Sequence, residues 1–371
     1  MLLQTSLPEP NGLADPGARK ALSHRANRSA WRHFSAWAGV GVGVGSPRWG
    51  GPSVFGSPMK AGLHSDSRAV CRVTSQSPVQ RSRRTGAQSL SRLGFSVPRI
   101  EIPPGTCIRS VYLAHNSAAK VLVVRTGFGR LYVKGPSGVN GDAMLLREWV
   151  GTRLAEFFGL PTFRYGLMSE PLGTSPDELV LSDESHLRHD VVFAAVEEPG
   201  VVWEGGREQL DLVGNRSAFS RLVVLDTWMR NLDRCVPLQD GRLHQNKSNV
   251  FISSNKDRGR KPQVLAIDHT HVLGDETPLE QGDASPHVED TRIFGLFPEF
   301  VSFVSPKDIA SALAALSNVD FAGMQDIVGS VPPTWGMTAD RTQRLAEFLV
   351  ARARYVVGRG SQPFLDALGD V

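Results

Sequence analysis

Strand patterns precede helical patterns in this chain, and that order limits the folds that it can adopt. Three short apolar and β-branched runs occupy residues 107–115, 120–126 and 130–135, with turn sequences between them. They predict a three-stranded antiparallel meander. A helix is predicted directly afterwards, over residues 142–159, because apolar residues recur at three- and four-residue spacing, an aspartate can cap its start and a glycine ends it.

The remaining elements continue this order. They are strands over residues 163–169 and 189–198, a helix over 217–232, a β-hairpin over 249–253 and 263–268, and helices over 306–316 and 338–357. Strands followed by helices are typical of the α+β class. We therefore predict an α+β fold with two lobes joined by a short connection, a small β-rich lobe over about residues 101–198 and a mostly helical lobe over about 199–371.

The first hundred residues differ in composition from the rest. They hold 35 glycines, prolines and serines, and 12 arginines and 2 lysines against 3 acidic residues, a net charge of +11. The whole chain carries +4, so residues 101–371 carry −7. No helical or strand periodicity is sustained over residues 1–100, which predicts a disordered basic leader. The alternatives are an organelle transit peptide, a flexible tail, or a start codon assigned too far upstream.

This charge distribution narrows the expected partners. The pI of the whole chain is about 9.1, and the basic residues that raise it lie in the leader. Nucleic-acid binding is therefore expected only as a weak contact through that segment. No run of eighteen apolar residues occurs, which predicts no membrane-spanning helix. The three cysteines are widely spaced and odd in number, which favours a reducing compartment and a cytoplasmic location. No pattern in the sequence specifies an oligomeric state.

A lysine and a glutamate fall where a nucleotide site would need them. Lys134 ends the third predicted strand, and Glu148 lies in the middle of the helix that follows. A lysine on a strand can hold nucleotide phosphates, and an ion pair with Glu148 would fix its ammonium group and keep it protonated. The turn between the first two strands has no glycines to let its backbone approach a phosphate, so Asn116 and Ser117 are the candidate contacts there. Gly127 and its neighbours are better explained as a plain hairpin turn.

Three further polar residues match the needs of phosphoryl transfer. Asp233 follows a predicted helix, Asn249 opens a strand 16 residues later, and Asp268 ends its partner strand 19 residues beyond that. One carboxylate can orient an attacking hydroxyl, while an amide oxygen and a second carboxylate supply the hard oxygen ligands that Mg²⁺ prefers. Asn246 is a second candidate for the amide ligand. Arg234 is left open between a phosphate contact and a salt bridge, with Asp233 as one partner.

In these stretches the sequence resembles the HipA-like kinase family, which is distantly related to protein kinases and phosphatidylinositol kinases. The similar stretches are YVKG, LLREWVGTRLAEFFGLP, LDTWMRNLDR, NKSNVFI, IDHTHVLG and the closing TADRTQRLAEFLVARARYVV. The resemblance covers about residues 107–357. It implies a bilobal kinase fold over residues 101–371, ATP and Mg²⁺ as cofactors, and transfer of the γ-phosphoryl group to a hydroxyl, most often Ser or Thr of a protein.

The resemblance also implies roles for individual residues. Lys134 would contact the ATP phosphates, Glu148 would anchor it, and Asp233 would be the catalytic base. Asn249 and Asp268 would bind Mg²⁺. The adenine would lie against the connection near residues 193–198, where the candidate contacts are Phe193, Ala195 and Val196.

Two alternatives stay open beside the protein kinase interpretation. A pseudokinase would bind nucleotide or a partner without turnover, and the glycine-free turn favours it. A lipid or small-molecule kinase would use the same core, although the net charge of −7 over residues 101–371 is unfavourable at an anionic membrane surface.

Removal of the leader gives a first test. We expect a chain lacking residues 1–95 to bind ATP with unchanged affinity, because every candidate site residue lies beyond that segment. Isothermal titration of the truncated and full-length chains measures this. Loss of soluble protein on truncation would contradict the prediction of a disordered leader.

Overall fold

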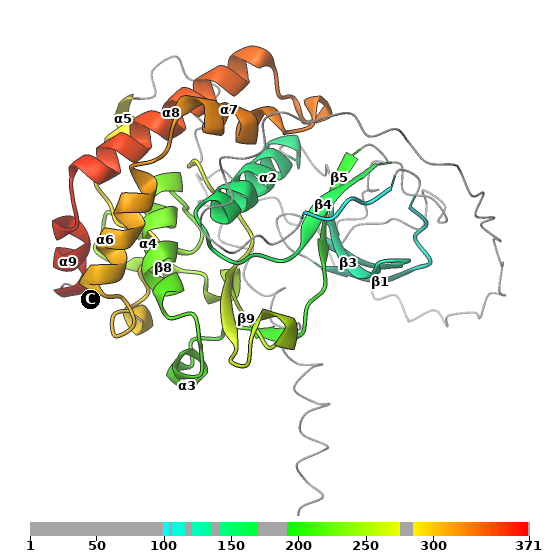
Figure 1. Cartoon of the computed structure of the whole chain (residues 1–371), viewed down its shortest axis with the longest axis horizontal. Coiled ribbons are helices and arrows are strands. Elements are labelled where there is room, and N and C mark those ends of the chain that lie inside the picture. Colours follow the sequence, from blue (N-terminus) through cyan, green and yellow to red (C-terminus); the bar gives the residue numbers. More distant parts are fainter. Residues whose placement is uncertain are drawn as a thin grey trace, which may run out of the picture.

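A computed structural model describes residues 99–103, 106–115, 121–135, 141–169, 191–274 and 285–369. The predicted leader therefore lies almost wholly outside the described residues. Within them the protein is a mixture of antiparallel sheet and helices. Figure 1 shows helix α2 (Gly141–Phe157) between the largest sheet and the helical part of the chain.

The largest sheet has five antiparallel strands in the order β1-β2-β3-β5-β4. The strands are β1 (Ser110–His115), β2 (Val121–Thr126), β3 (Gly129–Lys134), β4 (Tyr165–Ser169) and β5 (Val191–Val196). The predicted meander is confirmed as β1-β2-β3. The register pairs Thr126 with Gly129 across a two-residue turn, so the hairpin interpretation of this glycine-containing segment is also confirmed. Gly129 has φ +101°, a conformation that favours glycine.

Alternation along the strands gives the sheet two different faces. Leu122, Val124, Leu131 and Val133 pack in one apolar cluster on one face. Their neighbours on the same strands, among them Val123 and Tyr132, point to the other face and join the main core with α2. Because side chains alternate with a period of two, Lys134 shares the face of Tyr132 and points toward α2.

Two smaller sheets follow in the chain. One has the order β10-β9-β6, and the other pairs β7 with β8. Their strands are β6 (Gly200–Val202), β7 (Cys235–Pro237), β8 (Leu243–Gln245), β9 (Val250–Ser253) and β10 (Gln263–Ala266). The predicted pairing of the last two strands is confirmed. The β7–β8 hairpin was not predicted, and it occupies the long segment between Asp233 and Asn249.

In the helical part of the chain, α4 packs against α6, α8 and α2. The helices after α2 are α3 (Arg207–Asp211), α4 (Ser217–Met229), α5 (Ser285–Val288), α6 (Pro306–Leu316), α7 (Phe321–Gly329), α8 (Ala339–Gly358) and α9 (Gln362–Gly369). Single 3-10 turns cover Lys247–Asn249, Lys256–Arg258, Pro298–Phe300 and Pro333–Trp335. Among the described helices none is long and apolar enough to cross a membrane.

Trp228 fixes α4 against α8. Its side chain is fully buried, and its indole N–H donates to the carbonyl of Leu349 at 2.9 Å. The ring therefore contributes both apolar burial and a satisfied polar group, which is typical of a tryptophan in a core.

Substitution at this position should be costly. We expect Trp228→Ala to lower the free energy of unfolding by about 3–5 kcal/mol because it leaves a large cavity. Trp228→Phe should cost about 1–3 kcal/mol, because the hydrogen bond from the indole N–H to the Leu349 carbonyl is lost and the smaller ring fills the site less well. Urea unfolding measures both. Phe321→Ala is the control, because Phe321 is already 39% exposed and should change stability by less than about 1 kcal/mol. Equal effects for Trp228→Ala and Phe321→Ala would contradict the assignment.

Candidate active site

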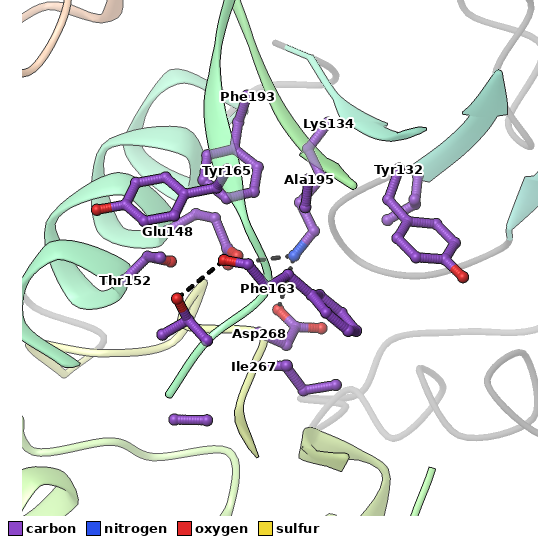
Figure 2. A pocket seen from close by; sticks show the side chains of 13 residues that line it. Tyr132, Lys134, Glu148, Thr152, Phe163, Tyr165, Phe193, Ala195, Ile267 and Asp268 are labelled. Carbon is purple, nitrogen blue, oxygen red and sulfur yellow. Dashed lines mark hydrogen bonds and ion pairs between the residues drawn. The ribbon is translucent and has the colours of Figure 1, made fainter. Parts of the chain in front are cut away.

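Lys134 lies between two carboxylates. Its Nζ is 3.1 Å from Oε2 of Glu148 and 3.2 Å from Oδ1 of Asp268. Figure 2 shows the ammonium group pointing at both acids, which reach it from α2 and from the segment after β10. The predicted ion pair between Lys134 and Glu148 is therefore confirmed, and Asp268 is a third member of the same cluster.

The electrostatics of this cluster favour the charged forms of Lys134 and Asp268. Burial alone would lower the pKa of the Lys134 ammonium, but Asp268 and Glu148 outweigh burial and raise that pKa above its ordinary value. Burial alone would likewise raise the pKa of Asp268, but Lys134, His271 and Thr270 lower it to about 2. Burial raises the pKa of Glu148, while Lys134 opposes that rise. The ammonium and the Asp268 carboxylate thus remain ionised at neutral pH.

Close packing of α2 on the segment after β10 holds this cluster together. The backbone N–H of His269 donates to Oε2 of Glu148 at 2.8 Å. One helical turn further along the same face, Gly151 faces His269, and a Cβ atom at position 151 would lie only 2.4 Å from the Cβ of His269. Glycine is therefore required here so that the helix can approach closely enough for this hydrogen bond.

Asp268 lies in an irregular segment beyond the end of the strand. β10 ends at Ala266, two residues earlier than the sequence predicted, and Asp268 adopts φ +55°. This left-handed conformation is uncommon outside glycine, and aspartate tolerates it better than most residues. Oδ1 of its carboxylate contacts Lys134 and also accepts a hydrogen bond from the Thr270 hydroxyl at 2.9 Å. Oδ2 of Asp268 receives no hydrogen bond from the described residues.

Asp233 forms the centre of a second polar cluster. Its Oδ2 accepts hydrogen bonds from the side-chain amides of Asn249 at 2.7 Å and Asn246 at 3.1 Å. His244 Nε2 lies 3.5 Å from Oδ1, and His271 Nδ1 lies 3.6 Å from Oδ2. Both asparagines that the sequence suggested as amide ligands of Mg²⁺, Asn246 and Asn249, therefore contact Asp233. Asn249 closes a 3-10 turn immediately before β9, whereas the sequence predicted it as the first residue of the strand.

Arg234 links the segments that carry these clusters. It is fully buried and pairs with Asp226 of α4, and not with Asp233. Its Nε donates to the carbonyl of Asn249 at 3.1 Å and its Nη2 to the carbonyl of Ile267 at 2.9 Å. The sequence left Arg234 open between a phosphate contact and a salt bridge. The structure shows a salt bridge, and the partner lies eight residues earlier in the chain.

An apolar pocket adjoins the Lys134 cluster. It measures about 620 Å³ including the part that is open to solvent. Four aromatic side chains line it, namely Tyr132, Phe163, Tyr165 and Phe193, together with aliphatic residues such as Val121 and Ile267. The rings of Tyr165 and Phe193 are stacked with centroids 5.9 Å apart.

Of the nucleotide contacts predicted from the sequence, some line the pocket and others do not. Phe193 and Ala195 line the pocket, whereas the side chain of Val196 packs in the apolar cluster on the opposite face of the sheet. The cause is the alternation along β5, which continues through Val196, so the connection itself begins at residue 197. Asn116 and Ser117 lie outside the described residues.

The sequence matches a family model over most of the region that carries these clusters. The model describes a HipA-like kinase, and it matches residues 125–365. The chain belongs to the HipA-like kinase family. A similar solved structure is that of the Helicobacter pylori proinflammatory kinase CtkA, at 13% sequence identity and a TM-score of 0.45, covering 71% of this chain and 99% of that chain. No curated protein matches the sequence.

Asn249 and Asp268 of this HipA-like kinase offer oxygen donors, the ligand type that Mg²⁺ prefers. No group of three or more His, Cys, Asp or Glu residues suited to a metal ion occurs among the described residues. Asn249 gives its amide N–H to Asp233, which leaves its amide oxygen without a donor in the described part of the chain. Asp268 likewise has Oδ2 available. Mg²⁺ binds through few protein oxygens and takes the others from phosphates and water, so this donor set fits it.

Sequence reasoning missed several features of the site. His244 and the hairpin that carries it gave no signal, because strands of three residues are too short for a period of two to be visible. Asp226 lies within the LDTWMRNLDR motif, but nothing in the motif selects it over Asp233 as the partner of Arg234. Of the aromatic pocket lining only Phe193 was predicted. Tyr132, Phe163 and Tyr165 were not, since aromatic residues in predicted strands are usually core residues.

The packing of α2 gives a test of the site's rigidity. We expect Gly151→Ala to lower the free energy of unfolding by about 1–3 kcal/mol, because the added methyl group forces α2 away from His269. Gly358→Ala in α8 is the matched control, since a Cβ there would meet nothing within 4 Å. That change should be neutral or slightly stabilising. The two variants are compared by urea unfolding, and a Gly151→Ala protein as stable as the Gly358→Ala protein would contradict the close approach.

Proposed function

We propose that the protein is an ATP- and Mg²⁺-dependent kinase that transfers the γ-phosphoryl group to a Ser or Thr hydroxyl of a protein. The observation that carries the proposal is the single lysine held between Glu148 and Asp268 beside an apolar pocket. Membership of the HipA-like kinase family supports it. In this proposal residues 101–198 form the N-lobe and 199–371 the C-lobe of a bilobal kinase domain.

The pocket is the proposed site of the adenine ring. Its aromatic and aliphatic lining offers apolar surfaces to a planar base. The ring would lie against the segment of residues 193–198, of which Phe193 and Ala195 line the pocket. Lys134 at the polar end of the pocket would contact the phosphates. Because Glu148 and Asp268 hold its ammonium group in place, the charge is oriented before the nucleotide arrives.

Asn249 and Asp268 are the proposed holders of Mg²⁺, through the amide oxygen of the first and Oδ2 of the second. When bound, the ion neutralises charge that builds up on the phosphate oxygens. Arg234 keeps the two segments in place by donating hydrogen bonds to two backbone carbonyls, those of Asn249 and Ile267.

Asp233 is the proposed catalytic base. The side-chain amides of Asn246 and Asn249 donate to its Oδ2 and so fix that oxygen. Among the described residues, His244 lies near the other oxygen, Oδ1. Oδ1 is therefore the atom that would accept a hydrogen bond from the substrate hydroxyl and take its proton. Most of the rate enhancement would come from this positioning and from the charges around the phosphates.

The rival proposal is a pseudokinase, which the glycine-free turn over residues 115–120 favours. A lipid or small-molecule kinase is the other alternative. The cysteine usage favours a reducing compartment, so we propose a cytoplasmic location for the kinase.

The decisive experiment compares Asp233→Asn with the wild type. We expect a loss of at least about a hundredfold in phosphate transfer from γ-labelled ATP with Mg²⁺, because a positioned base contributes about 10²–10⁴ in rate. Transfer is measured to the protein itself, to proteins of a cell lysate and to phosphatidylinositol vesicles. Thermal shift with ATP and Mg²⁺ should show retained nucleotide binding. Asp340→Asn, an exposed aspartate on α8, is the matched control.

The outcomes separate the candidates. Equal transfer by wild type and Asp233→Asn would contradict the role of Asp233. A raised melting temperature with ATP and Mg²⁺, without label on any acceptor, would favour the pseudokinase. Label in vesicle lipid alone would favour a lipid kinase.

A further inference from the structure

We propose that the acceptor is an extended polypeptide segment that pairs with the free edge of β8, beside Asp233. This inference rests on the proposed function and goes further, because it names the surface that receives the substrate. The edge belongs to the β7–β8 hairpin, which begins two residues after Asp233.

The hydrogen-bond pattern of the hairpin leaves this edge open. The N–H of Asn246 donates to the carbonyl of Arg234 at 2.7 Å, and the N–H of Leu238 donates to that of Arg242 at 2.8 Å. Hydrogen-bonded pairs alternate along an antiparallel ladder, so the pair between these two is the one that includes His244. The backbone groups on either side of His244 therefore point away from β7.

Those outward groups belong to Leu243 and Gln245. No backbone or side-chain hydrogen bond to either residue's outward N–H or carbonyl is present among the described residues. The other edge of the hairpin is different, because Gly295 donates its N–H to the carbonyl of Cys235 at 2.8 Å. Only the β8 edge of this two-stranded sheet is thus left to pair with another chain in the part of the protein that the structure describes.

The two faces of β8 fix where an added strand would place its side chains. Leu243 packs against the main core, so its face is directed inward. His244 points to the other face and approaches Oδ1 of Asp233 at 3.5 Å, and its imidazole is 46% exposed. Residues directly opposite one another in a sheet share a face. Every second side chain of an added segment would therefore lie on the face of His244 and Asp233, where a Ser or Thr hydroxyl is needed.

This edge is complementary to a polypeptide backbone. It presents donors and acceptors at the spacing of an extended chain, which is how a peptide adds to a sheet edge. The charged side chains of the hairpin do not offer a free cationic site for a lipid headgroup, because Arg242 is engaged by Asp240 at 2.7 Å. The net charge of −7 over residues 101–371 is also unfavourable at an anionic lipid surface.

Backbone N-methylation of the substrate gives a direct test with the wild-type protein. The probe is a synthetic library of nine-residue peptides with one central Ser and degenerate flanks, from which a labelled sequence is selected. In an antiparallel addition the acceptor's own N–H points away from β8, while the N–H groups of its two neighbours point toward it. We expect N-methylation at either neighbour to raise the peptide KM about tenfold, since one backbone hydrogen bond is worth up to about that factor. N-methylation at the acceptor or two residues away should change the KM less than about threefold.

A protein variant tests the same contact from the other side. Gln245→Pro removes the outward N–H, and proline is tolerated on an edge strand. Gln245→Val keeps the N–H and is the matched control. We expect the proline variant to raise the peptide KM about tenfold over the valine variant, with melting temperature used to confirm folding. If the proline variant does not fold, the N-methylated series decides the question alone.

Each outcome has a distinct meaning. An alternating effect of N-methylation supports pairing with β8. Equal effects at both sets of positions, or none at either, overturn it while leaving the kinase assignment intact because peptide is still labelled. Label in the protein itself or in vesicle lipid, but in no peptide, overturns the pairing as well. Absence of transfer to any acceptor would contradict the proposed function and with it this inference.

Discussion

One buried guanidinium connects helix α4 with two of the chain segments that carry candidate active-site residues. Arg234 pairs with Asp226 on α4 and donates to two carbonyls, one at Asn249 before β9 and one at Ile267 after β10. Both ends of the ion pair are withdrawn from water, so losing either partner would leave an uncompensated charge in the core. The positions of Asp233 and Asn249 are consequently tied to the interior of the helical part of the protein.

The second constraint is the position of α2. The helix is attached on one side to the segment after β10, through the hydrogen bond from His269 to Glu148. On another side, Trp149 and Arg153 both donate to the hydroxyl of Ser330, at 2.9 and 2.6 Å. Glu148 therefore reaches Lys134 because the helix is fixed along its length. The ion pair follows from packing and does not have to be strong by itself to persist.

The sequence predicted the parts of the site that depend on local pattern. Lys134 at a strand end and Glu148 in the next helix followed from periodicity, and the family resemblance selected Asp233, Asn249 and Asp268. What the sequence did not predict depends on contacts between distant segments or on short elements. The left-handed backbone conformation of Asp268 and the ion pair between Arg234 and Asp226 depend on contacts in the folded protein. No local sequence pattern indicates either of them. The β7–β8 hairpin was missed because its strands are three residues long and one contains a proline.

The base of that hairpin has a consequence for how the protein tolerates change. The backbone hydrogen bond from Asn246 to Arg234 closes the hairpin at its neck, directly beside Asp233. The covalent path around the hairpin is therefore not what holds Asp233 against Asn249. Insertions or deletions at the tip alter the outer surface without displacing the carboxylate. Under the proposed pairing with β8, a change at the tip of the hairpin would alter acceptor recognition without moving Asp233.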